Sequence, residues 1–300
     1  MSYQELTLPS KDGYRLALRI YEAEKPKAVI KVIHGMQEYQ DRYRMFAEYL
    51  QVAGYTVVTA DLRGHGPNAP ALSHIADRDG HLRLLEDEEV IQEEIRRRWT
   101  GTPVILFSHS MGTILARVFL QKHSREFEKV ILSSYPNPNS AAGAASVLTD
   151  VLALFKGAKG YSKLVDGMVT EPFSKAVPDA KTPRDWLSVD EENVRKYNED
   201  PLCGVRFTLG SYNTLFRLLQ LMDKPERYEN VRKDLPILMI SGADDPCTGG
   251  EKGRAGSVDR LERAGFDNLT VITIDGMRHE ILNEAKKEDV YRTILEFVEK

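Results

Sequence analysis

The sequence predicts an α/β protein with a mostly parallel, doubly wound sheet and a helical insertion. Short β-branched runs alternate with longer amphipathic runs over residues 14–133, and this alternation resumes at residue 236. Strands that alternate with helices form parallel sheets with helices on both faces. The intervening stretch reads as helical throughout, which is typical of an insertion between two parts of one core.

The first half alternates strand and helix patterns in order. Residues 14–21 alternate apolar and polar side chains, which predicts a strand with one wet face. The β-branched runs at 27–33 and 55–60 predict strands covered on both faces. The remaining predicted elements are helices at 43–52, 82–99 and 114–122, and strands at 104–109 and 129–133.

The second half begins with a break in this rhythm. Residues 135–230 open on Pro-Asn-Pro-Asn and continue helically, with an alanine-rich amphipathic segment at 141–155. The alternation then returns with strands at 236–241 and 269–274 and helices at 251–264 and 283–298. We therefore expect a core formed by residues 1–134 and 231–300, with residues 135–230 as a helical cap.

Composition excludes several classes of function. The chain has 300 residues, 42% of them hydrophobic, and a net charge of −4, which offers no basic surface to nucleic acid. Cys203 and Cys247 without an export signal are typical of reduced thiols. No apolar run approaches the length of a membrane span. These observations predict a cytoplasmic protein that does not cross a membrane.

Residues 104–113, VILFSHSMGT, have the pattern of a nucleophile elbow centred on Ser110. A serine hydroxyl becomes a useful nucleophile when a sharp strand-to-helix turn exposes it beside a base and backbone N–H donors. Small residues two before and two after the serine allow such a turn. Gly112 satisfies this requirement, whereas Ser108 stands where the usual pattern has glycine.

An acid and a histidine follow the serine at the required places. Asp244 and Asp245 come directly after the strand at 236–241, and His279 follows the strand at 269–274. In the chain order Ser, Asp, His, the histidine acts as general base and the aspartate orients it. We predict Asp245 as the acid because Pro246 stiffens the loop after it, with Asp244 as the alternative.

The oxyanion of ester attack needs backbone N–H donors. The pattern predicts one at Met111, directly after the nucleophile, and one at Met36, in the loop after the strand at 27–33. Gly35 lets the backbone approach the substrate. His34 is predicted to have a supporting role beneath this loop.

Three rival interpretations are weaker. His34, Asp61 and Ser110 follow the order of a chymotrypsin-like triad, but that triad belongs to antiparallel barrels. Residues 64–69 match a dinucleotide-binding pattern, yet their prolines oppose a helix start. The seven histidines show no metal-binding spacing. We therefore expect no metal and no cofactor.

Taken together, these motifs resemble the α/β-hydrolase superfamily, and within it the lysophospholipase and monoacylglycerol lipase group, also described as serine aminopeptidase-like hydrolases. The motifs that carry the resemblance are HGMQE at 34–38, DLRGHG at 61–66, SHSMG at 108–112, GADDP at 242–246 and GMRHEILNE at 276–284. The resemblance implies Ser110, Asp245 and His279 as triad, and Met36 and Met111 as oxyanion donors. Ser108 and Tyr39 depart from the group's pattern.

The expected function is hydrolysis of carboxylic esters through an acyl-enzyme on Ser110. Monoacylglycerols and lysophospholipids are the preferred substrates, and a short-chain carboxylesterase, a peptidase or amidase, and a non-catalytic ligand-binding protein are the alternatives. The apolar helix face at 147–155 either packs on the core or lines an acyl tunnel and contacts a lipid surface. The sequence leaves homodimer formation open.

Overall fold

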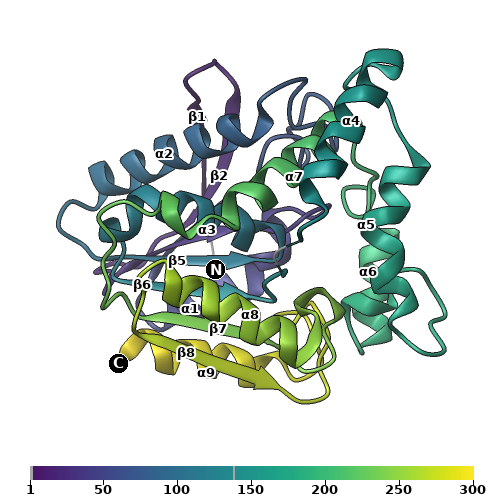
Figure 1. The fold of residues 1–300 in the computed structure, drawn as a ribbon. Coiled ribbons are helices and arrows are strands. Elements are labelled where there is room, and N and C mark those ends of the chain that lie inside the picture. The colour runs from purple at the N-terminus through teal and green to yellow at the C-terminus, as the bar shows by residue number, and fades with distance from the viewer. Residues whose placement is uncertain (1–2, 138) are drawn as a thin grey trace.

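A computed structural model describes residues 3–137 and 139–300, and its centre is an eight-stranded sheet (Figure 1). The strand order is β1-β2-β4-β3-β5-β6-β7-β8, with β1 and β2 antiparallel to their neighbours and parallel pairing from β4 to β8. The predicted mostly parallel sheet is confirmed. The strands are β1 (Gln4–Pro9), β2 (Arg15–Tyr21), β3 (Val29–Ile33), β4 (Thr56–Ala60), β5 (Val104–His109), β6 (Lys129–Ser133), β7 (Ile237–Gly242) and β8 (Leu269–Ile274).

Strand β1 escaped prediction because its six residues carry little hydrophobic signal. It lies at the edge of the sheet and none of its side chains is fully buried. An edge strand can form through backbone pairing with its neighbour alone. The strands that the sequence did predict are largely those whose β-branched residues are buried by helices on both faces.

Helices cover both faces of the sheet and create two separate apolar cores. One core joins the sheet to α2 (Gly80–Arg98), α3 (Met111–His123) and α8 (Gly250–Arg263). The other joins the opposite face to α1 (Arg44–Val52) and α9 (Lys287–Glu299). The last helix begins at Lys287 rather than near residue 283, because the preceding residues form a turn used by the active-site region.

Helices also fill the chain between β6 and β7. These are α4 (Ala142–Lys156), α5 (Lys163–Lys175), the short 3-10 helix η3 (Asp185–Leu187), α6 (Glu191–Glu199) and α7 (Leu209–Met222). Helix α7 packs against the core helices α2 and α3, and α4 packs on α7. Helices α4, α5 and α6 lie at the edge where the parallel strands end (Figure 1). Ligands of open parallel sheets bind at this edge.

Within the part of the chain that the structure describes, no helix is both long and apolar enough to cross a bilayer.

Candidate active site

Ser110 occupies a strained turn between β5 and α3. Its φ of 50° and ψ of −122° are rare for a residue with a side chain, and such a conformation costs about 1–3 kcal/mol. The Ser110 N–H donates to the Ser133 carbonyl at 3.0 Å, and the Thr113 N–H donates to the Ser110 carbonyl at 2.8 Å. These bonds hold the serine at the apex of the turn, as the elbow pattern predicts.

The two small residues of the elbow have different physical requirements. A Cβ on Gly112 would lie 2.4 Å from the Ile33 carbonyl oxygen, so this position accepts only glycine without rearrangement. Ser108 instead lies inside strand β5 with an ordinary extended backbone, and its hydroxyl donates to the Ile131 carbonyl at 3.3 Å. The departure from glycine at position 108 is therefore accommodated by the sheet.

The structure brings Asp245, and not Asp244, to His279. Both carboxylate oxygens of Asp245 lie 3.0 Å from His279 Nδ1, and both side chains are buried. Asp244 is exposed, although its backbone N–H donates to the Met277 carbonyl. The Cys247 N–H donates to Asp245 Oδ1 at 2.9 Å and fixes the carboxylate. The acid and the base therefore form a rigid pair.

Electrostatics favour a basic imidazole in this pair. Burial alone lowers the pKa of His279, but the charge of Asp245 and its hydrogen bond raise it above the ordinary value. Burial, together with the positive form of His279, lowers the pKa of the neighbouring His109 well below its usual range. His109 therefore stays neutral, while His279 can take a proton near neutral pH.

Ser110 and His279 line the same small cavity, of about 20 Å³, together with Gly35 and Met36. A cavity of this size accommodates about one water molecule. Met111 is the first residue of α3, so its N–H has no partner within the helix. The predicted nucleophile and base thus line one small cavity with Met36, and Met111 lines the adjacent large cavity together with Ser110 and Met36.

A buried glutamate supports the loop that carries Met36. Glu38 Oε1 accepts the Gly35 N–H at 2.6 Å and the Tyr43 hydroxyl at 2.7 Å. A Cβ on Gly35 would lie 2.7 Å from that oxygen and 3.0 Å from the Ser110 Cβ. Glycine at position 35 therefore lets the loop pass between the glutamate and the serine.

His34 is buried beneath the loop that carries Gly35 and Met36. Its Nε2 accepts the Leu62 N–H at 2.9 Å, and its Nδ1 lies 2.8 Å from the Gly35 carbonyl oxygen. Asp61 bonds the Gln40 N–H and side chain, so the chymotrypsin-like arrangement does not form. Residues 64–69 form turns rather than a helix start, which removes the geometry of a dinucleotide site.

A larger cavity of about 410 Å³ opens beside Ser110, between the core and the inserted helices. Met36, Met111 and Cys247 line its floor, and burial raises the pKa of the Cys247 thiol. The inserted helices contribute mainly apolar walls. These wall residues are Ala142, Ala145, Met168, Val169, Pro172, Phe173, Leu215, Phe216 and Leu219.

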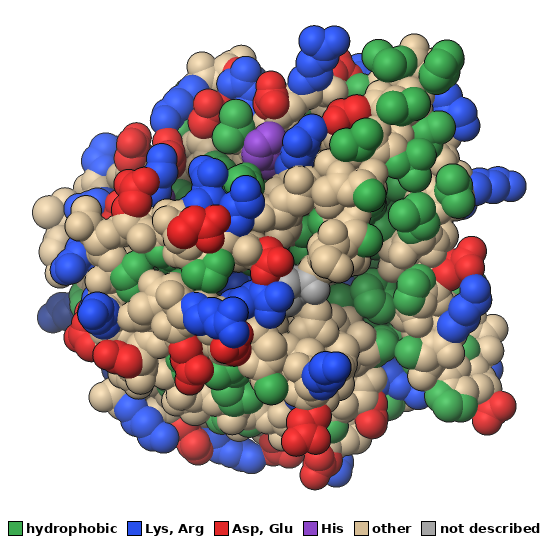
Figure 2. Space-filling view, in the orientation of Figure 1, with side chains coloured by type: hydrophobic (Ala, Val, Ile, Leu, Met, Phe, Trp, Pro, Cys, Tyr) green, Lys and Arg blue, Asp and Glu red, His purple; other side chains and the backbone are tan. Residues whose placement is uncertain are grey.

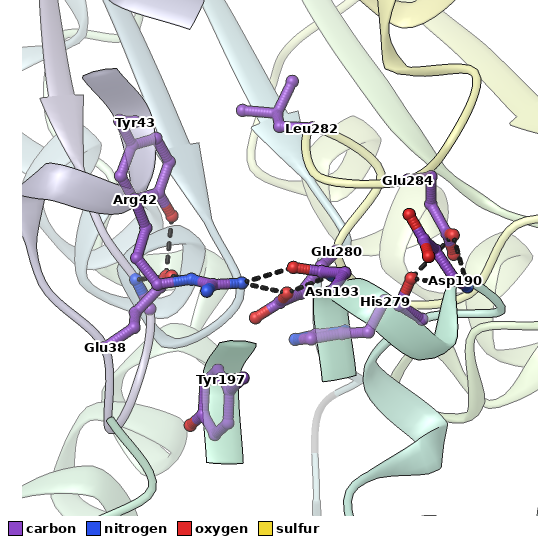
Figure 3. A network of polar contacts seen from close by, with 12 residues as sticks. Glu38, Arg42, Tyr43, Asp190, Asn193, Tyr197, His279, Glu280, Leu282 and Glu284 are labelled. Atoms are coloured by element: carbon purple, nitrogen blue, oxygen red, sulfur yellow. Dashed lines mark hydrogen bonds and ion pairs between the residues drawn. The ribbon is translucent and has the colours of Figure 1, made fainter. Parts of the chain in front are cut away.

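The sequence did not predict the polar network beside this site (Figure 3). Arg42 lies between Glu38 and Glu280, and Asn193 of α6 donates to Glu280 Oε2 at 2.7 Å. Burial and the charge of Glu280 raise the pKa of Glu38 to about 7. Trp186, whose ring contacts His279, was also missed. The only signal for Glu280 and Glu284 was their place in the motif that follows the histidine.

This architecture is the α/β-hydrolase fold. Two solved structures illustrate it. A thermostable carboxyl esterase from Bacillus coagulans, in complex with glycerol, has a TM-score of 0.91 and 24% identity, over 100% of this chain and 98% of that one. A monoacylglycerol lipase from Paleococcus ferrophilus has a TM-score of 0.68 and 21% identity, over 99% and 98%.

The chain belongs to the Hydrolase_4 family, described as serine aminopeptidase, S33, whose model matches residues 24–286. Phospholipase YtpA of Bacillus subtilis (strain 168) is 26% identical over 281 residues, which cover 93% of this chain and 98% of that protein. Monoglyceride lipase of Homo sapiens is 26% identical over 293 residues, covering 94% and 86%. The predicted resemblance is confirmed.

Proposed function

We propose that this protein is a serine hydrolase that cleaves carboxylic esters, with neutral monoacylglycerols as the best-fitting substrate class. The chemistry of the 410 Å³ cavity carries this proposal. Among the described residues that line it, none is Asp, Glu, Lys, Arg or His. An apolar, uncharged cavity that opens on a serine suits an acyl chain followed by an uncharged alcohol.

The reaction follows from the placement of the candidate residues. Ser110 Oγ attacks the ester carbonyl while His279 takes its proton, and the Met36 and Met111 N–H groups stabilise the oxyanion. His279 then returns the proton to the departing alcohol. A water molecule, activated by the same imidazole, hydrolyses the acyl-enzyme. Asp245 keeps His279 in the required tautomer and stabilises the imidazolium.

Lysophospholipids are the second candidate substrate class. The similarity to a phospholipase supports them, but the described lining residues offer no cation to pair with a phosphate. A peptidase, which the family description suggests, would need an acidic group to bind a free amino terminus. The same lining residues offer none.

Initial rates distinguish these candidates. The substrates are p-nitrophenyl esters from acetate to palmitate, a monoacylglycerol, a lysophosphatidylcholine of the same chain and an aminoacyl p-nitroanilide. We expect the monoacylglycerol to have the highest kcat/KM and the anilide the lowest. A sharp preference for acetate would contradict the lipase assignment. A preference for the anilide would identify a peptidase.

We also propose that α4 and α5 contact lipid surfaces. Hydrophobic side chains gather over these helices on the face shown in Figure 2. Leu154 is 80% exposed and Phe155 is 83% exposed, and Val147, Val151 and Leu164 are exposed near them. A contiguous exposed apolar patch is typical of a protein or membrane contact. Its position above the cavity would bring the protein to water-insoluble substrate.

A cytoplasmic location is part of the same proposal. Cys203 and Cys247 are both buried and unpaired. Unpaired cysteines suit a reducing compartment.

A further inference from the structure

Trp186 packs against the ring of the candidate base. The centroid of its ring lies 4.8 Å from that of His279, with the planes tilted by 49°. Phe173 of α5 packs on Trp186 at 4.9 Å. Trp186 is buried, and it lines both the small cavity and the large one. A side chain from the inserted segment therefore forms one wall around the imidazole.

The loop that carries His279 holds the turn that carries Trp186. The Glu280 N–H donates to the Leu187 carbonyl at 2.7 Å. Arg278 Nη1 donates to the carbonyls of Asp185 and Ser188, at 2.7 and 3.1 Å. These bonds join the residues on either side of His279 to those on either side of Trp186. These hydrogen bonds fix the position of the Trp186 ring relative to the His279 ring.

Glu284 is the buried carboxylate that fixes this connection. Its Oε1 accepts the Val189 N–H at 3.0 Å and the Arg278 N–H at 3.1 Å. Its Oε2 accepts the Ser188 hydroxyl at 2.6 Å and the Asp190 N–H at 3.2 Å (Figure 3). The residue is 1% exposed. Four hydrogen bonds to one carboxylate hold its two oxygens in a defined position, and hydrogen bonds to an ionised carboxylate are stronger than those between neutral groups.

The same inserted segment also contacts the oxyanion loop. The Tyr197 hydroxyl and the Gly204 N–H both donate to the Gln37 carbonyl at 2.8 Å. Arg184 Nη1 donates to Gln37 Oε1 at 3.0 Å. Gln37 has a φ of 60°, a conformation that needs such support. The segment 184–204 therefore braces both candidate catalytic loops, whereas α4 and α5 line the large cavity.

We propose that Glu284 is a positioning residue that acts through residues 185–190. It holds Trp186 against His279, and this contact orients the imidazole and excludes water from it. The catalytic part of this inference rests on the proposed function. Without the Glu284 charge, the turn at residues 185–190 loosens. Water then reaches the His279 imidazole, and the imidazole ring becomes more mobile. The loss falls on kcat, because Glu284 itself touches neither cavity among their described lining residues.

Fluorescence tests the geometry without any substrate. The chain has two tryptophans, so Trp99→Phe leaves Trp186 as the single tryptophan, which can be excited selectively over the tyrosines. A protonated imidazole in contact with indole quenches its emission more than a neutral one. We expect emission to rise with pH through a midpoint above the ordinary histidine value, and the step to vanish in His279→Ala. The ionisable groups that face His279 are Asp245, His109, Glu280 and Glu38, with Arg42 behind them.

The positioning role is tested with Glu284→Gln in the same background. We expect the fluorescence step to lose at least half its amplitude. On p-nitrophenyl acetate we expect kcat to fall by about tenfold or more while KM stays within about twofold, as for a lost transition-state interaction. Ser188→Ala removes one donor to Glu284 and should produce a smaller change in the same direction, even if Glu284→Gln fails to fold.

Glu192→Gln is the matched control, since Glu192 lies on α6 and its side chain is half exposed. It should keep the step and the rates of the parent. If Ser188→Ala and a folded Glu284→Gln both keep the full step and the parental kcat, the positioning role is refuted. If the step is present and depends on Glu284 in a protein that hydrolyses none of the esters, the positioning is supported and the proposed function is contradicted.

Discussion

The core loops and the inserted helices form opposite walls of the site, and they are specified in different ways. The core loops use local rules: a glycine where a Cβ would strike a carbonyl, and a strained serine between a strand and a helix. The inserted segment is held by side chains far away in the chain, such as Glu284 on Ser188. Local motifs therefore specify the candidate catalytic groups, and long-range contacts hold the inserted segment against them.

The largest expected effect on activity is the difference between substitutions at the adjacent residues Asp245 and Asp244. Asp245→Asn should lower kcat/KM on p-nitrophenyl butyrate by about 10⁴-fold, because the amide stabilises the wrong histidine tautomer. Asp244→Asn is the matched control and should stay within about twofold of the wild type, as expected for an exposed side chain away from the reaction. A greater loss for Asp244→Asn would overturn the assignment of the acid.

The elbow offers a second paired test of local specification. Gly112→Ala should lower the free energy of unfolding by about 3 kcal/mol, since its Cβ would overlap the carbonyls of Ile33 and His34. Ser108→Gly should cost only about 1 kcal/mol, through lost strand stability and one hydrogen bond. Denaturant unfolding measures both. Equal losses in the free energy of unfolding would contradict the different steric requirements inferred for positions 108 and 112.

The exposed apolar side chains of α4 should affect binding to lipid surfaces and not the chemical step. The double variant Leu154→Gln and Phe155→Gln should bind neutral phosphatidylcholine vesicles at least about tenfold more weakly, since burying even one such side chain is worth about 1.5–3 kcal/mol and about 1.4 kcal/mol is a factor of ten. Its rate on soluble p-nitrophenyl butyrate should not change. Val52→Gln, on the exposed end of α1, is the control. Unchanged vesicle binding in the double variant would remove the proposed lipid contact.

The smallest expected effect is a shift in the pH dependence of kcat/KM, which should respond to changes in the core loops but not to changes in the inserted helices. Activity needs neutral His279, so kcat/KM should rise with pH through a midpoint above about 6.5, because Asp245 raises the pKa of the imidazole. Asp245→Asn removes that charge and should move the midpoint to lower pH. The Leu154 and Phe155 double variant should keep it. A midpoint that moves with the exposed apolar residues would contradict the division of roles.

Much of the core was predictable because its signals are local. Strand β6 and the turn at Ser110 follow from consecutive residues, and the order of the motifs places Asp245 and His279 at the same sheet edge. The choice between Asp244 and Asp245 rested on one proline, and the geometry favours Asp245. Strand β1 was missed because backbone pairing rather than burial defines it.

The supporting residues could not be predicted for a different reason. Glu38, Glu280 and Glu284 look like ordinary surface charges in the sequence, yet each is buried in the fold. A buried carboxylate requires donors, and here they come from distant residues: Ser188 lies 96 positions from Glu284, and Arg42 lies 238 positions from Glu280. The local pattern of the sequence does not indicate which distant residues meet. The contact between Trp186 and His279 is therefore visible only in the folded structure.

Labelling with a fluorophosphonate probe tests the central claim most directly. The probe reacts with an activated serine, and digestion followed by mass spectrometry locates the modified residue. We predict a single adduct on Ser110, complete loss of labelling in Ser110→Ala, and strongly slowed labelling in Asp245→Asn but not in Asp244→Asn. A folded wild-type protein that does not react, or an adduct on any other serine, would contradict the assignment of Ser110 as the nucleophile of an ester hydrolase.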